Sequence, residues 1–281
     1  MPTWGEARAA ATLRLRDGAD PQTAALDADV LLAFVLGVEK EQLLAHPERA
    51  LATEAGARFD VLVERRRTGE PVAYLRGFKE FYGLRFGVDP RVLIPRPETE
   101  TLVEEARRVI AGRALTIVDV GTGSGAIACA IAASEPGVRL IATDVSADAL
   151  VVASANARSL GVSDRVELRK GELLAPVAER VEIVCANLPY LREDALAHLA
   201  AERTSLAFEP RAAVVAGRDG LDLIRRAVLD LPRVLASGGV ALFECDPPQA
   251  HEIAQLTRER GLTSRIVRDL AGAERVVAAS S

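Results

Sequence analysis

The chain has 281 residues, of which 49% are hydrophobic and 27% charged, and its formal net charge at pH 7 is −5. This composition excludes a disordered or fibrous protein and provides a sizeable core for one large domain or two smaller ones. No apolar run reaches the roughly 18 residues of a membrane span, and no export signal is evident, so we expect a cytoplasmic protein. The acidic balance argues against a protein whose main partner is nucleic acid.

The cysteines and histidines give no sign of a disulfide framework or a metal site. Cys129, Cys185 and Cys245 lie far apart, each in an apolar stretch, and the three histidines are scattered. No CxxC spacing or other ligand pattern is present. We therefore expect three small, buried, hydrophobic cysteines and no metal.

The first 70 residues predict a helical domain. Apolar residues recur at helical spacing in residues 7–15, 21–36 and 54–67. Asp20 suits the N-cap of the second helix, with Pro21 in its first turn, and Gly37 suits its exit.

A β-hairpin is predicted next, because residues 72–88 intersperse aromatic side chains with glycines. This hairpin could be a hinge or lid between two domains, or a simple connector with a small core of its own.

Strands and helices alternate in the rest of the chain, after a helix that ends near residue 111. This alternation predicts a Rossmann-like α/β fold, with a mostly parallel sheet covered by helices on both faces. A hairpin of residues 264–269 and 275–279 would add an antiparallel last strand. The other expected strands are 115–120, 139–143, 166–169, 183–186 and 240–245, and the expected helices are 125–134, 147–160 and 221–235.

A glycine-rich turn, Gly121-Thr122-Gly123-Ser124-Gly125, joins a strand to a helix. Glycines allow a tight turn and the close approach of a ligand. Asp144 ends the next strand, about twenty residues on, where a carboxylate can bind two ribose hydroxyls. NAD and S-adenosylmethionine both carry such a ribose. Asp119 favours a methyltransferase, in which an acidic residue there lies near the methionine end. Glu172 would then lie beside adenine, or it is a solvent-exposed glutamate of a loop.

The tetrapeptide Asn187-Leu188-Pro189-Tyr190 follows an apolar strand and should lie at the same sheet edge. An amide nitrogen is a poor nucleophile because its lone pair is delocalised. The Asn187 side-chain oxygen and the Leu188 carbonyl can accept its two hydrogens, while Pro189 stiffens the backbone. Such bonds strengthen as positive charge grows on the nitrogen, and Tyr190 can stack on the substrate and face the sulfonium. These four residues are the predicted catalytic and substrate-binding residues; a simple turn that ends a strand is the alternative.

These motifs resemble the peptide chain release factor N5-glutamine methyltransferases of bacteria and organelles. Residues 77–83 and 92–100 are similar to the family's interdomain signature, and residues 208–211 and 217–221 also look like the family. The resemblance implies a seven-stranded class I methyltransferase that uses S-adenosylmethionine and releases S-adenosylhomocysteine. It implies a substrate-recognition domain at 1–70, a hairpin linker at 71–95 and a methyltransferase domain at 96–281.

The activity implied by the resemblance is methylation of the glutamine of the Gly-Gly-Gln motif in class 1 release factors. Release factors would be the partner, and we expect a monomer with no direct nucleic-acid contact. Arg96 and Pro97 would lie beside the substrate. The implied cofactor-binding residues are Asp119, Gly121, Thr122, Gly123, Gly125, Asp144, Val145, Gly171, Glu172 and Asn187.

Two departures from the family pattern leave alternatives open. Leu188 stands where the family usually has proline, and Asn-Leu-Pro-Tyr is also familiar from ribosomal RNA adenine dimethyltransferases. The family's glutamate is present as Glu244, but a different loop, Cys245-Asp246-Pro247-Pro248, follows it. The alternatives are glutamine methylation of a ribosomal protein, adenine N6-methylation of nucleic acid, an NAD-dependent oxidoreductase and a non-catalytic module.

Overall fold

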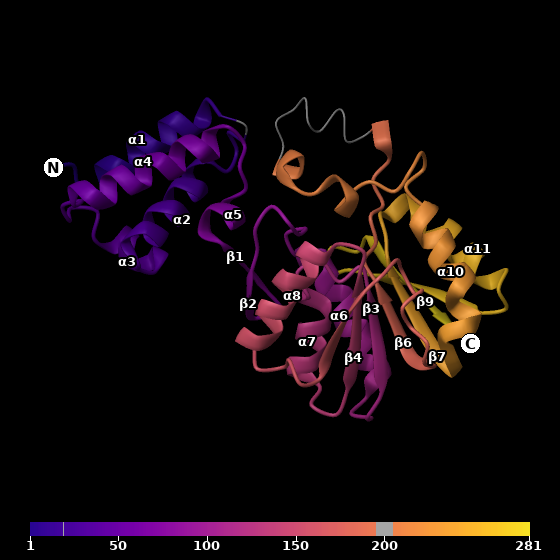
Figure 1. Cartoon of the computed structure of the whole chain (residues 1–281). Helices are drawn as coiled ribbons and strands as arrows, with labels where there is room; N and C mark the ends of the chain where they lie inside the picture. Colours follow the sequence, from indigo (N-terminus) through magenta and orange to yellow (C-terminus); the bar gives the residue numbers. More distant parts are fainter. Residues whose placement is uncertain (19, 195–204) are drawn as a thin grey trace. The chain divides into compact units, whose positions relative to one another are not determined.

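The computed structural model describes residues 1–18, 20–194 and 205–281. The chain divides into two compact units (Figure 1). The first comprises Met1–Phe78 and residues 205–208, and the second comprises residues 79–194 and 209–281. The boundary after Phe78 falls inside the segment 71–95 that the sequence indicates as a linker.

The N-terminal part of the first unit is helical, as predicted. Its core is formed by apolar side chains such as Leu31, Leu32, Phe59 and Val63. Thr3 and Glu6 form a capping box that fixes the start of the first helix. The helices are α1 (Trp4–Arg16), α2 (Ala24–Leu36), α3 (Lys40–Ala45), α4 (Thr53–Arg67) and α5 (Val72–Arg76).

Two boundary predictions in this unit are wrong. Helix α2 begins at Ala24, not Pro21, and Asp20 forms an ion pair with the buried Arg66 instead of capping a helix. Residues 72–76 form α5 and not the first arm of a hairpin, because Pro71 starts a short helix that the left-handed Gly77 ends.

The predicted hairpin is therefore shorter than expected. It consists of β1 (Phe78–Phe81) and β2 (Leu84–Gly87). Tyr82 and Gly83 both have positive φ at its turn, as a tight two-residue connection requires. The backbone of Gly87 forms two hydrogen bonds with the Asn156 side chain, so β2 is fixed to the helix Ala147–Ser159 within the second unit.

The second unit contains a seven-stranded sheet in the order β5-β4-β3-β6-β7-β9-β8. Strands β3 to β7 are parallel, and β9 is antiparallel to both its neighbours. The predicted fold class, including an antiparallel last strand, is confirmed. The strands are β3 (Thr116–Val120), β4 (Arg139–Asp144), β5 (Val166–Lys170), β6 (Val181–Ala186), β7 (Leu235–Glu244), β8 (Thr263–Arg268) and β9 (Glu274–Ser280).

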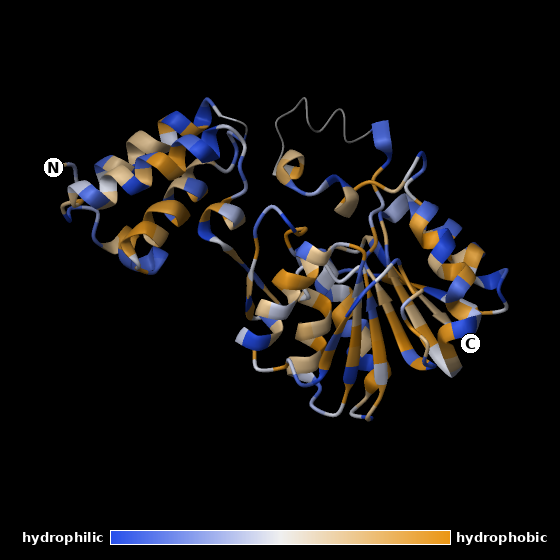
Figure 2. Ribbon diagram, viewed as in Figure 1, coloured by the Kyte–Doolittle hydropathy of each residue, from blue (hydrophilic) through white to orange (hydrophobic). Residues whose placement is uncertain are grey.

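Helices cover both faces of this sheet, so its central strands are apolar on both sides (Figure 2). Ile117 packs into the core under α6 to α8, and the next residue, Val118, packs into the core under α10 and α11. Helix α11 was not predicted. The helices are α6 (Glu100–Ile110), α7 (Ala126–Ser134), α8 (Ala147–Ser159), α10 (Asp222–Val234) and α11 (Ala250–Arg258), and the described 3-10 turns are η1 (Pro97–Thr99), η2 (Ser205–Phe208), η3 (Arg211–Ala213) and η4 (Pro247–Gln249).

The three cysteines are buried and unpaired, as predicted. Among the described helices, none has the length and apolar character to cross a membrane.

Candidate active site

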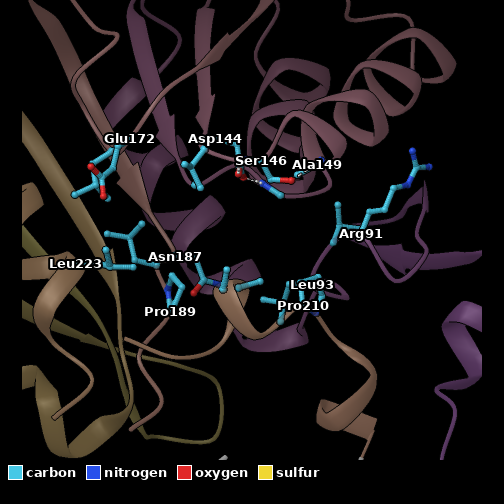
Figure 3. Close-up of a pocket in the computed structure, with 18 residues that line it drawn as sticks. Arg91, Leu93, Asp144, Ser146, Ala149, Glu172, Asn187, Pro189, Pro210 and Leu223 are labelled. Carbon is cyan, nitrogen blue, oxygen red and sulfur yellow. Dashed lines mark hydrogen bonds between the residues drawn. The ribbon is translucent and has the colours of Figure 1, made fainter. Parts of the chain in front are cut away.

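The carboxyl ends of three neighbouring strands bring the predicted motifs together. The glycine turn follows β3, Asp144 ends β4, and Asn187 follows β6, with β3 in the middle of the three. A cavity opens at this edge, and in Figure 3 Asp144 and Ser146 lie across it from Asn187 and Pro189. The predicted residues that line it are Gly121, Gly123, Asp144, Val145, Glu172, Asn187, Leu188 and Pro189.

The glycine turn is held open by backbone hydrogen bonds. The amides of Gly121 and Thr122 both donate to the Thr143 carbonyl at 2.9 Å. The Asp144 carboxylate accepts from the Gly123 amide and the Ser146 amide, each at 2.9 Å. A Cβ on Gly123, which has a φ of +55°, would meet no protein atom within 4 Å. The turn therefore leaves room for a ligand, and the remaining lone pairs of the Asp144 carboxylate fit the ribose hydroxyls of a nucleoside cofactor.

Asp119 lies beneath the turn. It is fully buried and accepts hydrogen bonds from the Thr122 hydroxyl at 2.6 Å and the Ala128 amide at 3.2 Å. Burial raises the pKa of Asp119 to about 6. Asp119 is not among the described residues that line the cavity, so its contact with the methionine end of a cofactor stays a prediction.

Two predicted glycines allow close packing below the cavity. Gly125 caps α7, and a Cβ there would lie 3.2 Å from the Ala153 Cβ. A Cβ on Gly171 would lie 2.8 Å from the Pro176 ring. Neither glycine is found among the described lining residues, and their direct contact with a cofactor stays a prediction.

The Asn187 side chain has a fixed partner behind the cavity. Its Nδ2 donates a hydrogen bond to Thr99 Oγ1 at 3.0 Å. Within the described part of the chain no group donates to Asn187 Oδ1 or to the Leu188 carbonyl. Both oxygens therefore keep their lone pairs for a ligand.

The rest of the tetrapeptide is held by packing. The Leu188 side chain is buried, and a Cβ on Gly121 would lie 3.1 Å from its Cδ2. The Tyr190 carbonyl accepts a hydrogen bond from Gln249 Nε2 at 3.1 Å. Burial and the nearby Glu244 raise the pKa of the Tyr190 phenol to about 12. Tyr190 does not occur among the described lining residues, and its stacking role stays a prediction.

Arg96 is held near the same edge by a buried ion pair. Its guanidinium contacts Glu209, whose side chain is fully buried and also accepts the Ile94 amide at 3.1 Å. Burial raises the pKa of Glu209, and Arg96 opposes that shift. Arg96 and Thr122 line a small hollow that shares Gly121 and Asn187 with the main cavity. Pro97 instead lines a different hollow, next to Glu98.

Several residues of the site were missed by the sequence reasoning. The cavity is also lined by Arg91, Leu93, Pro210 and Leu223 (Figure 3). Thr99, Glu209 and Glu244 support it from behind. Thr99 and Glu209 lie in stretches that resemble the family, which was the available signal, whereas Leu223 belongs to an amphipathic helix and could not be told from core.

Comparison with known proteins decides the family. The model of the PrmC N-terminal domain matches residues 6–77, and that of the methyltransferase small domain matches residues 98–207. A release factor glutamine methyltransferase from Rhodopirellula baltica is 39% identical and covers 90% of this chain and 88% of its own. One from Bordetella pertussis is 41% identical, with 92% and 95% covered. The chain belongs to the release factor glutamine methyltransferase family.

The family that the sequence motifs resemble and the predicted enzyme class, a methyltransferase, are therefore confirmed. A solved T. thermophilus 16S rRNA N2 G1207 methyltransferase, in complex with AdoMet and guanosine, superposes with a TM-score of 0.53. It is 16% identical, and the match covers 73% of this chain and 49% of that one, so it supports the fold alone.

Proposed function

We propose that the protein transfers a methyl group from S-adenosylmethionine to the N5 side-chain amide of the glutamine in the Gly-Gly-Gln motif of class 1 release factors. Relatives named for this activity share 35 to 41% identity over most of the chain. The observation that carries the proposal within the site is the Asn187 amide, whose nitrogen is occupied by Thr99 while its oxygen is left for a ligand.

We infer that the glycine turn and Asp144 hold the cofactor. The backbone of Gly121 and Gly123 would lie against it, and Asp144 would accept the ribose hydroxyls, with Val145 and Glu172 near the base. When bound, S-adenosylmethionine supplies an electrophilic methyl group on a sulfonium. Glu172 is exposed and pairs with Arg226 at 2.7 Å, so this ion pair would have to coexist with the bound cofactor or give way to it.

The substrate amide would be held by two oxygens of the chain. Asn187 Oδ1 and the Leu188 carbonyl would each accept one hydrogen of the glutamine nitrogen, and Pro189 limits the backbone freedom between them. Both bonds strengthen as the nitrogen becomes positive, so they stabilise the transition state more than the ground state. A fixed nitrogen about 3 Å from the methyl group also gains from proximity.

We also infer the class of substrate, the compartment, the oligomeric state and the roles of the domains. The acidic net charge of −5 supports a protein substrate over direct nucleic-acid binding, and we expect a cytoplasmic monomer. The match of the PrmC N-terminal domain to residues 6–77 supports a separate N-terminal domain, and we infer that residues 1–70 recognise the substrate, followed by a linker at 71–95 and a catalytic domain at 96–281.

The substrate is tested with labelled cofactor and three acceptors offered separately: a full-length class 1 release factor, ribosomal proteins and ribosomal RNA. We expect label on the release factor and a gain of one methyl on the Gly-Gly-Gln glutamine by peptide mass spectrometry. A release factor with glutamate at that position is the matched control and should stay unlabelled. Label confined to RNA or to ribosomal proteins would overturn the proposed substrate.

The role of Asn187 is tested by Asn187→Ala, with Leu188→Pro as the matched control in the same tetrapeptide. Loss of the side-chain acceptor should lower kcat by about 100-fold or more, while the Kd for S-adenosylhomocysteine changes little. Leu188→Pro keeps its carbonyl and should keep kcat within about 10-fold, because it removes packing but no acceptor. Equal kcat in Asn187→Ala and the parent enzyme would refute the role.

A further inference from the structure

Glu244 is a buried carboxylate that the proposed reaction has not yet used. It ends β7, and its neighbour Phe243 pairs in the sheet with Ala186, the residue before Asn187. Its side chain is 1% exposed, and neither carboxylate oxygen has a hydrogen-bond partner of full geometry among the described residues. Thr99 and Asn187 lie beside it and favour its charged form. A buried, incompletely paired carboxylate is costly, so it calls for a functional reason.

The neighbouring Thr99 links this carboxylate to Asn187. A threonine hydroxyl can both donate and accept, and a carboxamide can present either its oxygen or its NH2 to a substrate. Thr99 alone therefore does not decide which end of Asn187 faces the cavity. An ionised carboxylate only accepts, so an ionised Glu244 would orient the Thr99 hydroxyl hydrogen toward itself. The Thr99 oxygen is then left to accept Asn187 Nδ2, as observed at 3.0 Å.

We propose that Glu244 is a positioning residue: its carboxylate, acting through the Thr99 hydroxyl, keeps the carbonyl oxygen of Asn187 turned toward the substrate amide. The proposal rests on the proposed function, because only an NH2 substrate needs an acceptor at that position. An Asn187 turned the other way would present two donors to the two hydrogens of the glutamine amide, which is repulsive.

The groups around Glu244 make the orientation of the Asn187 carboxamide dependent on pH. Burial raises the pKa of Glu244 to about 7, and Glu98 on η1 adds to this, while Thr99, Arg275 on β9 and Asn187 oppose it. Tyr190 and Cys245 also interact electrostatically with the carboxylate, and burial raises the pKa of each to about 12, so both stay neutral near pH 7.

Protonation of Glu244 removes the directing effect. Below about pH 7 the neutral carboxyl can itself donate to the Thr99 hydroxyl, which can then donate to Asn187 and stabilise the wrong orientation. We therefore expect kcat to rise with pH through the neutral range. Asp119, whose burial raises its pKa to about 6, is a second group near the site that titrates close to this range.

The test measures kcat and the KM for S-adenosylmethionine from pH 5.5 to 9 with the full chain and a release factor. The parent should show an acid limb with an apparent pKa near 7. Glu244→Gln should lose this limb and fall about 10- to 100-fold in kcat at pH 8, with KM changed less than about 3-fold. An unchanged limb in Glu244→Gln assigns the titration to another group, such as Asp119, and overturns the proposal.

A pair of Thr99 variants keeps the test decisive if Glu244→Gln does not fold. Thr99→Ser keeps the hydroxyl and should stay within about 3-fold of the parent, whereas Thr99→Val is nearly isosteric without it and should lose about 10- to 100-fold in kcat. Equal kcat in the two variants contradicts the link. A parent enzyme that methylates no release factor refutes the proposed function instead, so the two failures are distinguishable.

Discussion

Gly220 should be essential for catalysis because it lies against the backbone of the tetrapeptide. It has a φ of +78°, and a Cβ there would lie 2.1 Å from the Tyr190 carbonyl oxygen and 2.7 Å from Gln249 Nε2. To move the added Cβ and the Tyr190 carbonyl oxygen to an ordinary contact distance, the backbone at residue 220 or at Tyr190 must shift by about 1 Å. Since the Tyr190 carbonyl belongs to the tetrapeptide, this shift should displace the two acceptor oxygens. A displacement of about 1 Å can lower the rate by about 100-fold.

The prediction is tested by comparing Gly220→Ala with Gly261→Ala. Gly261 has a nearly equal φ of +80°, and a Cβ there would meet no atom within 4 Å. Gly261→Ala should lose about 1 kcal/mol of unfolding free energy from the left-handed backbone, and Gly220→Ala should lose more, because its Cβ also clashes with the Tyr190 carbonyl; urea denaturation measures both losses. Only Gly220→Ala should lose about 100-fold in kcat/KM on a release factor. A Gly220→Ala enzyme within about 3-fold of Gly261→Ala would refute the reasoning.

Two further predictions follow from the charged groups at the site. Asp144→Asn should weaken S-adenosylhomocysteine binding by about 10- to 100-fold in calorimetry, because the variant loses a charged acceptor that binds the turn and, in the proposed function, the ribose hydroxyls; an unchanged Kd would contradict this. Arg96→Met should lower the unfolding free energy by about 3 kcal/mol at pH 7, because Glu209 is left buried without its cation. Burial already holds the pKa of Glu209 above the ordinary value for a glutamate, and it should rise further in this variant, so the loss should shrink as the pH falls toward 4; a loss independent of pH would argue against it.

The sheet was predictable because its strands and helices carry strong local signals. A parallel strand buried on both faces gives an apolar run, and residues such as Ile117 and Val118 show this directly. The glycine turn and Asp144 could be placed at one edge because the carboxyl ends of parallel strands meet there. Short helices gave weaker signals: α5 has only five residues and lies in an aromatic stretch that also suits a strand.

The supporting residues could not be predicted because their partners are distant in sequence. Thr99 lies 88 residues before Asn187, and Glu209 lies 113 residues after Arg96. From the sequence, Glu244 is recognisable as the family's glutamate at the end of a strand, but not as a neighbour of Thr99 or Asn187. Its burial beside Thr99 and Asn187 depends on the order of β6 and β7 in the sheet and on the turn before α6.

The most direct measurement is a crystal structure of the enzyme with S-adenosylhomocysteine and a release factor whose Gly-Gly-Gln loop is intact. We expect the glutamine side-chain nitrogen within about 3 Å of both Asn187 Oδ1 and the Leu188 carbonyl oxygen, with its free side toward the cofactor sulfur. A glutamine nitrogen bound elsewhere, or an Asn187 that presents Nδ2 to it, would contradict the account.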